Sequence, residues 1–183
     1  MRGIAILTAV VALAACAPSN ASTGTSPTVG QTVRVSTSQG TLSAQTHTEI
    51  GASGSSVAFP LDRVWAVLPS VYDSLTIPVT TRDQQNHVIG NPDAKLKRRL
   101  GDVPLAKYLD CGSTLGSPNT DTYEIRLSVL TEARRDTVDG GTSVMTTLDA
   151  KGRSITIAAE YSPCRSTGAL EKKIVELVKA RLK

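Results

Sequence analysis

The sequence predicts a single α+β domain in which helices pack on one face of an antiparallel sheet, and three observations support this prediction. Residues 122–131 alternate polar and apolar side chains, which is typical of a half-buried strand. Residues 61–75 and 170–182 instead repeat apolar side chains at the spacing of an amphipathic helix. Asp139-Gly140-Gly141 is a strong turn signal between two alternating segments, so we expect neighbouring strands to run antiparallel.

The first part of the domain predicts exposed strands followed by a long helix. Residues 32–36 alternate, and residues 41–50 are polar and Thr-rich, which indicates one or two strands. Pro60 suits the first turn of the helix over 61–75, and Pro69 inside it predicts a kink or a break. Trp65 lies on the apolar stripe of this helix, where it is either a core aromatic or a ligand-stacking residue.

The middle of the chain predicts a hairpin followed by a second helical stretch. Residues 77–81 and 87–91 form the hairpin strands around a turn at 82–86, and helix is expected over 94–100, resuming at 105–109. Four cations cluster in this stretch, and they form either a solvated helix face or a contact with anionic headgroups or an acidic partner. These cations are Lys95, Lys97, Arg98 and Arg99.

The last part of the domain predicts a three-stranded meander and a closing helix. The meander consists of strands over 122–131, 142–150 and 153–160. Ser166 or Thr167 can cap the closing helix, which runs to about Leu182.

The N-terminal residues predict export and lipidation. Arg2 precedes an apolar run that is too short to span a bilayer, since a spanning helix needs about 20 residues. The run ends in Leu-Ala-Ala-Cys16, which resembles the lipobox of bacterial lipoproteins. The resemblance implies that residues 1–15 are a signal peptide and that Cys16 carries the lipid. The alternative is an ordinary cleaved signal with an incidental cysteine.

The segment after Cys16 predicts a tether to the membrane. Residues 16–31 are rich in Ser, Thr, Gly and Pro and carry no charge, so they cannot bury enough apolar surface to fold. Residues 32–183 then form the globular domain. Ala17 stands where an Asp signals inner-membrane retention in the lipoproteins that the lipobox resembles. We therefore expect attachment to the outer membrane, with the domain facing the periplasm.

Two cysteines remain once Cys16 is lipidated. Cys111 and Cys164 form an even pair in an oxidising compartment, so we predict a disulfide between them. Two free buried thiols are the alternative.

Residues 57–91 resemble a known pattern. Phe59-Pro60-Leu61-Asp62-Arg63-Val64-Trp65, followed by Val79-Thr80-Thr81-Arg82-Asp83, is similar to the domains of the lipoprotein C subunit of the β-barrel assembly machinery. The resemblance implies a helix-grip fold, in which a helix start leads into a strand, an Arg-Asp turn and a second strand. It also implies an envelope protein as a partner.

Composition and motifs favour a binding protein over an enzyme. The chain lacks a nucleophile elbow, a His-Glu-x-x-His motif and a phosphate-binding loop, and we predict neither cofactor nor metal for its two histidines, His47 and His87. A net charge of +4 with 3% aromatic residues does not indicate nucleic acid as a partner.

We therefore expect a lipid-anchored, non-catalytic envelope protein that binds a partner as an accessory or scaffold domain. The alternative is a carrier of a small apolar ligand in a cavity between sheet and helix. Its lining residues would be Trp65, Tyr72 and Tyr123.

Overall fold

The computed structural model describes residues 31–37, 40–46, 55–137 and 140–183. The expected signal peptide, Cys16 and nearly all of the expected tether lie outside these residues. So does His47. No helix in the described part of the chain is both long enough and apolar enough to cross a membrane.

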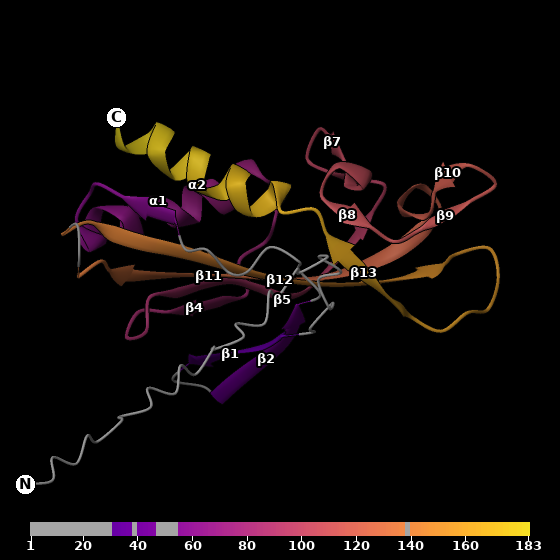
Figure 1. Ribbon diagram of the computed structural model, residues 1–183, viewed down its shortest axis with the longest axis horizontal. Helices are drawn as coiled ribbons and strands as arrows, with labels where there is room; N and C mark the ends of the chain where they lie inside the picture. The colour runs from indigo at the N-terminus through magenta and orange to yellow at the C-terminus, as the bar shows by residue number, and fades with distance from the viewer. Residues whose placement is uncertain (1–30, 38–39, 47–54, 138–139) are drawn as a thin grey trace, which may run out of the picture.

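One twisted antiparallel sheet forms the body of the molecule (Figure 1). Its two longest strands, β11 (Tyr123–Arg135) and β12 (Thr142–Ser154), pair along their whole length. β5 (Val88–Lys97) pairs with the other edge of β11. Each strand contributes one apolar face, because successive side chains of a strand point to opposite sides. The structure thus confirms an α+β domain with an antiparallel sheet and two helices.

Short strands extend this sheet on both sides. On the β5 side lie β4 (Thr81–Asp83), β6 (Arg99–Leu100) and β7 (Val103–Pro104). On the β12 side lie β3 (Ser55–Val57), β13 (Ser162–Ser166) and β8 (Leu109–Asp110). A separate small hairpin consists of β9 (Ser113–Thr114) and β10 (Ser117–Pro118).

Both helices cover one face of the sheet and lie against each other (Figure 1). Helix α1 (Leu61–Ser74) continues through Pro69, so the expected break is absent, and α2 (Ala169–Leu182) closes the chain. Two short 3₁₀ turns, Leu105–Lys107 and Asn119–Asp121, lie in the connection between β7 and β11. The core between helices and sheet is built from fully buried side chains. Its largest members include Tyr72, Leu68, Ile89, Ile125, Leu127 and Ile174.

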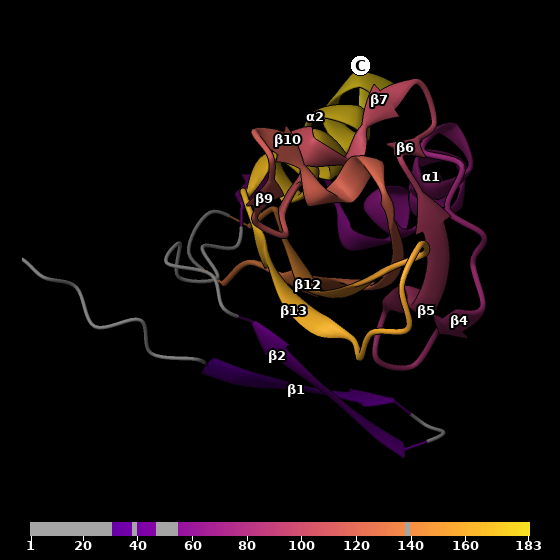
Figure 2. The ribbon, with the colours of Figure 1, turned by 90° about the vertical axis from the view of Figure 1, so that its right-hand side faces the viewer.

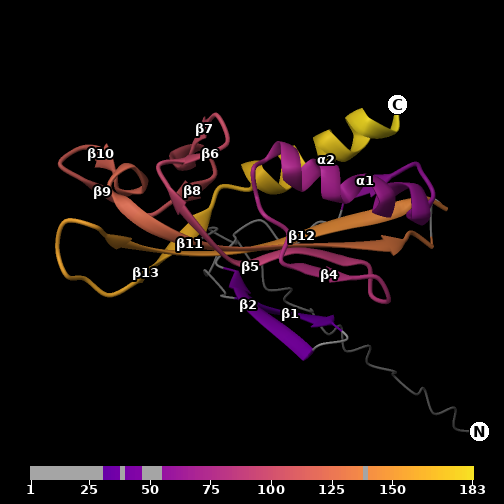
Figure 3. The ribbon, with the colours of Figure 1, turned by 180° about the vertical axis from the view of Figure 1, so that it is seen from behind.

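A two-stranded hairpin lies on the other face of the sheet. It consists of β1 (Gln31–Thr37) and β2 (Gly40–Thr46), paired in register from Gln31 opposite Thr46 to Thr37 opposite Gly40. β2 approaches β12, and the views from the end and from behind place the hairpin on the side away from both helices (Figures 2 and 3).

The expected helix over 94–100 is wrong, because these residues belong to β5 and β6. Lysines and leucines have good helix propensity, and Asn91-Pro92 looks like a helix start. The same residues also alternate, with Ala94 buried and Lys95 exposed. Ala94 pairs with Leu127 on β11, and this tertiary pairing overrides local propensity. Residues 105–109 likewise form only one 3₁₀ turn and the start of β8.

The third strand of the meander also lies elsewhere than expected. β12 continues to Ser154, where it reaches the first residue of its partner, Tyr123. Beyond that point residues 155–161 have no strand opposite them and leave the sheet, so the expected strand over 153–160 is wrong. The third strand is β13, which starts at Ser162.

The structure confirms the predicted disulfide. Cys111 and Cys164 are joined with Cα atoms 4.3 Å apart, and 53 residues separate them in sequence. The bond ties the segment after β8 to β13.

Candidate functional site

Two cross-strand rows of charged side chains lie at one end of the sheet. In the first row Lys97, Glu124 and Arg153 are direct neighbours on β5, β11 and β12. In the second row Lys95, Arg126 and Lys151 are neighbours in the same way. Their neighbours Ile125 and Leu127 are buried in the core, so the six side chains lie on the face away from the helices. We call these six residues the basic rungs.

Tyr161 covers the basic rungs. Its hydroxyl donates a hydrogen bond of 2.5 Å to Oε1 of Glu124. Its ring centroid lies 4.8 Å from Cζ of Arg153, 5.5 Å from Cζ of Arg126 and 5.6 Å from Nζ of Lys151. These are cation–π distances. One aromatic ring thus holds three cations of like charge close together.

The electrostatics of the basic rungs favour anions. The hydrogen bond from Tyr161, aided by the charge of Arg153, lowers the pKa of Glu124 below its usual range. Glu124 therefore stays ionised and pairs with Arg153 at 3.1 Å, while Arg126 pairs with Asp93 at 3.1 Å.

Three lysines of the basic rungs make no direct ion pair with a described residue, although Lys97 attracts the neighbouring Glu124 carboxylate. Lys95, Lys97 and Lys151 are exposed and form no ion pair within the described part of the chain. The surface between them can bind carboxylate or phosphate groups.

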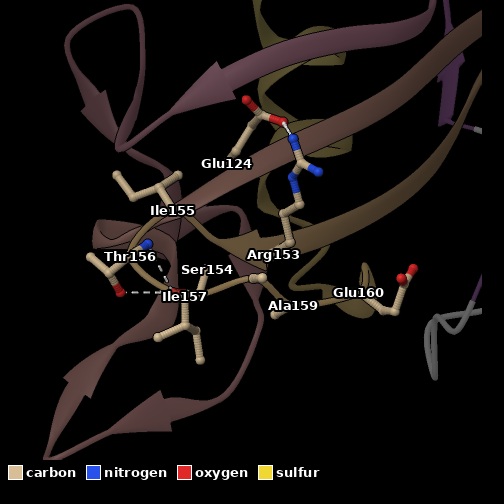
Figure 4. A pocket seen from close by; sticks show the side chains of 9 residues that line it. Glu124, Arg153, Ser154, Ile155, Thr156, Ile157, Ala159 and Glu160 are labelled. Carbon is tan, nitrogen blue, oxygen red and sulfur yellow. Dashed lines mark hydrogen bonds and ion pairs between the residues drawn. The ribbon is translucent and has the colours of Figure 1, made fainter.

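A loop with two exposed isoleucines borders the basic rungs. Residues 155–161 connect β12 to β13, and most of this loop lines an open pocket of about 750 Å³ together with Glu124 and Arg153. Figure 4 shows Arg153 reaching toward Glu124, while Ile155 and Ile157 point away from this ion pair. Ser154 fixes the start of the loop, since its hydroxyl accepts a hydrogen bond from the backbone N–H of Thr156. Cys164 holds the other end through the disulfide.

Among residues 55–137 and 140–183, the exposed large apolar side chains lie at this same end. Ile155 is 54% exposed, Ile157 is 68% exposed, and Leu115 is fully exposed at the tip of the β9–β10 hairpin. The hairpin and the 155–161 loop project from one end of the molecule in opposite views (Figures 1 and 3). We call the basic rungs, this loop and this hairpin together the distal end.

The structure divides the sequence-predicted cation cluster. Lys95 and Lys97 belong to the basic rungs. Arg98 instead donates from Nε to the carbonyl of Asp121 at 3.0 Å, and Arg99 donates to the carbonyl of Asp102. Sequence reasoning missed Arg126, Lys151, Arg153 and Tyr161, because the strand register that gathers them is a tertiary feature.

The three candidate ligand-lining aromatics occupy different environments. Tyr72 is fully buried, and its hydroxyl donates to the carbonyl of Ile89 and shares a 2.9 Å hydrogen bond with Thr131. Trp65 is buried in the core, with the ring of His87 edge-on at 5.4 Å. Tyr123 is half-buried against the core at the start of β11. None of the three lines the pocket beside the basic rungs.

Within the described residues no group of three His, Cys, Asp or Glu side chains is placed to hold a metal ion. Comparisons of the chain with models of known protein families, with curated proteins and with solved structures return no significant match.

Proposed function

We propose that this chain is a lipid-anchored, non-catalytic domain of the bacterial cell envelope. It acts as an accessory or scaffold by binding an envelope protein. Cys16 carries the lipid, the outer membrane holds the anchor, and the domain faces the periplasm. The core belongs to the helix-grip type, in which two helices lie against a strongly twisted sheet.

The distal end carries the binding part of this proposal. Soluble monomers scatter single apolar residues over their surface, whereas a local gathering of exposed apolar side chains marks an interaction site. Leu115, Ile155 and Ile157 gather there beside five cations of the basic rungs. A surface of this kind supports recognition.

Two further observations support the envelope as the compartment. The disulfide between Cys111 and Cys164 suits an oxidising space, because such bonds are rare in reducing cytosol. Helix α1 is followed by the β4–β5 hairpin, with Asp83 accepting two backbone hydrogen bonds in its turn. The resemblance of residues 57–91 implies the same order of helix, strand and strand, although Arg82 and Asp83 lie in β4 and not in the turn.

The test is a crosslinking pull-down of the tagged full chain from detergent-solubilised envelope, with mass spectrometry to identify the partners. We expect enrichment of an envelope protein, with barrel-assembly components the first to look for. The Cys16→Ser variant should lose both lipid labelling and this enrichment. A wild-type chain that carries no lipid, or that crosslinks to no protein, contradicts the proposal.

A further inference from the structure

We infer that the distal end docks on the anionic bilayer surface to which the chain is anchored, with Leu115, Ile155 and Ile157 entering the lipid. This inference rests on the proposed function, because it requires the lipid on Cys16. It adds an orientation: the domain does not tumble on its anchor but lies against the bilayer by one end.

The apolar side chains gathered at this end protrude from two separate loops. Leu115 stands alone at the turn of the β9–β10 hairpin, and the two isoleucines stand on a different loop. Separate protruding tips suit a bilayer, which is deformable and needs no matching shape. The cores of protein–protein interfaces instead enrich aromatic residues and deplete lysine. Here the tips are aliphatic, and three exposed lysines lie beside them.

The charge at this end is complementary to an anionic membrane. Five of the six basic rungs are cationic, and Glu124, the single carboxylate among them, is already paired with Arg153. Of the other carboxylates, Asp93 pairs with Arg126, Glu160 lies in the loop, and Asp149 lies on the same face of β12, two residues from Lys151. Peripheral membrane binding grows with buried apolar area and with attraction to anionic lipids, and the distal end offers both.

The chain between anchor and domain is short enough to keep the domain near lipid. Residues 17–30 separate Cys16 from the start of β1, and fourteen residues span at most about 50 Å. A tether of this length gives the domain a high effective concentration at the bilayer, so weak individual contacts suffice for docking.

The test places a fluorescent reporter at one of the exposed apolar residues, in the full-length chain. Ile157→Trp adds an exposed indole, whereas the native Trp65 is buried and gives a constant background. The lipidated protein is reconstituted into phosphatidylethanolamine vesicles with or without phosphatidylglycerol, and some vesicles carry spin-labelled lipid. The matched control is Ala180→Trp, an exposed position near the end of α2 on the helix side of the sheet.

We expect the emission of the Ile157→Trp variant to shift to shorter wavelength in anionic vesicles. Spin-labelled lipid should quench it several-fold more strongly than the emission of the Ala180→Trp variant. The difference should shrink at high salt, because screening weakens the attraction of the lysines for the headgroups.

Equal quenching of the two variants in vesicles that carry the protein overturns this inference alone. So does a wavelength shift of the Ile157→Trp variant that is equally large in vesicles without phosphatidylglycerol. Failure of the protein to float with vesicles contradicts the proposed anchor as well.

Discussion

Tyr72 places a fully buried hydroxyl in the core. It joins α1 to both long strands, because Thr131 on β11 binds the Tyr72 hydroxyl and also that of Thr146 on β12. Burial raises the pKa of Tyr72 well above its usual range, since a phenolate has no water to solvate it there. The hydroxyl therefore stays protonated and holds the helix in place on the sheet.

We predict that Tyr72→Phe lowers the free energy of unfolding by about 1 kcal/mol at pH 7, the usual net worth of a buried hydrogen bond. The substitution should change the pH dependence of the free energy of unfolding more distinctly than its value at pH 7. The folded chain holds the Tyr72 proton more tightly than the unfolded chain, so stability falls as pH rises above about 10. This residue alone contributes a slope of about 1.4 kcal/mol per pH unit. Denaturant unfolding of the wild type and the Tyr72→Phe variant between pH 8 and 11 checks this prediction. If the free energy of unfolding falls with pH equally in both proteins, Tyr72 is not the group responsible.

Gly90 is required where the pairing register of β5 and β11 shifts. Its φ is +156°, and an added Cβ would lie 2.0 Å from the carbonyl oxygen of Val129. We predict that Gly90→Ala lowers the free energy of unfolding by about 3 kcal/mol or more, because backbone has to move. Gly116 is the control: its φ is +81° but an added Cβ meets no atom within 4 Å. Gly116→Ala should cost about 1 kcal/mol in the same unfolding experiment.

Among the elements, β13 and the segment after β8 depend on the disulfide. We predict that the Cys111→Ser/Cys164→Ser double variant loses about 4 kcal/mol of stability, because the bond closes a loop across 53 residues of the unfolded chain. The measurement is chemical unfolding of the wild type and the variant, each with and without reductant. Reductant should destabilise only the wild type. Equal stability of oxidised wild type and variant would show that the bond adds nothing to folding.

The sequence predicted best those elements in which apolar residues repeat with a single clear spacing, either that of a helix or that of a strand. The stripe of 61–75, the alternation of 122–131 and the stripe of 170–182 became α1, β11 and α2 with small changes at their ends. Residues 94–97 failed because they satisfy two patterns at once, helix propensity and alternation. Pairing with β11 decides between the two patterns, and only the fold supplies that partner.

The candidate site was predictable only in part, for the same reason. Lys95 and Lys97 stood out as a dense charge run. Lys151 and Arg153 lie more than fifty residues further along the chain and become their neighbours only through the β11 register. Leu115 left a weak signal, as a single apolar residue in the polar turn Ser113 to Ser117. A strand register cannot be read from the local sequence pattern. The residues of the distal end could therefore be grouped only once the order and pairing of the strands were known.

At the scale of the whole molecule, the two faces of the sheet have different roles. The helix face contributes its side chains to the core. The other face carries the basic rungs and the β1–β2 hairpin, which Figure 2 shows on the side away from the helices. α2 also carries exposed lysines, among them Lys173 and Lys179. These lie on α2, on the opposite side of the sheet from the basic rungs. Position, and not net charge, should therefore decide which lysines attract an anionic bilayer.

Two charge-reversed variants with the same net charge separate position from composition. Each lysine near the surface of an anionic membrane contributes about 1 kcal/mol, and its reversal replaces attraction by repulsion of similar size. Lys95→Glu/Lys151→Glu should therefore weaken docking by about 4 kcal/mol. In the Ile157→Trp background this variant should lose quenching by spin-labelled lipid in anionic vesicles. Lys173→Glu/Lys179→Glu should retain the quenching. Both proteins should still float with the vesicles, because the anchor on Cys16 is untouched. Equal losses in the two variants would show that net charge alone attracts the domain, and that the arrangement of the basic rungs has no part in its orientation.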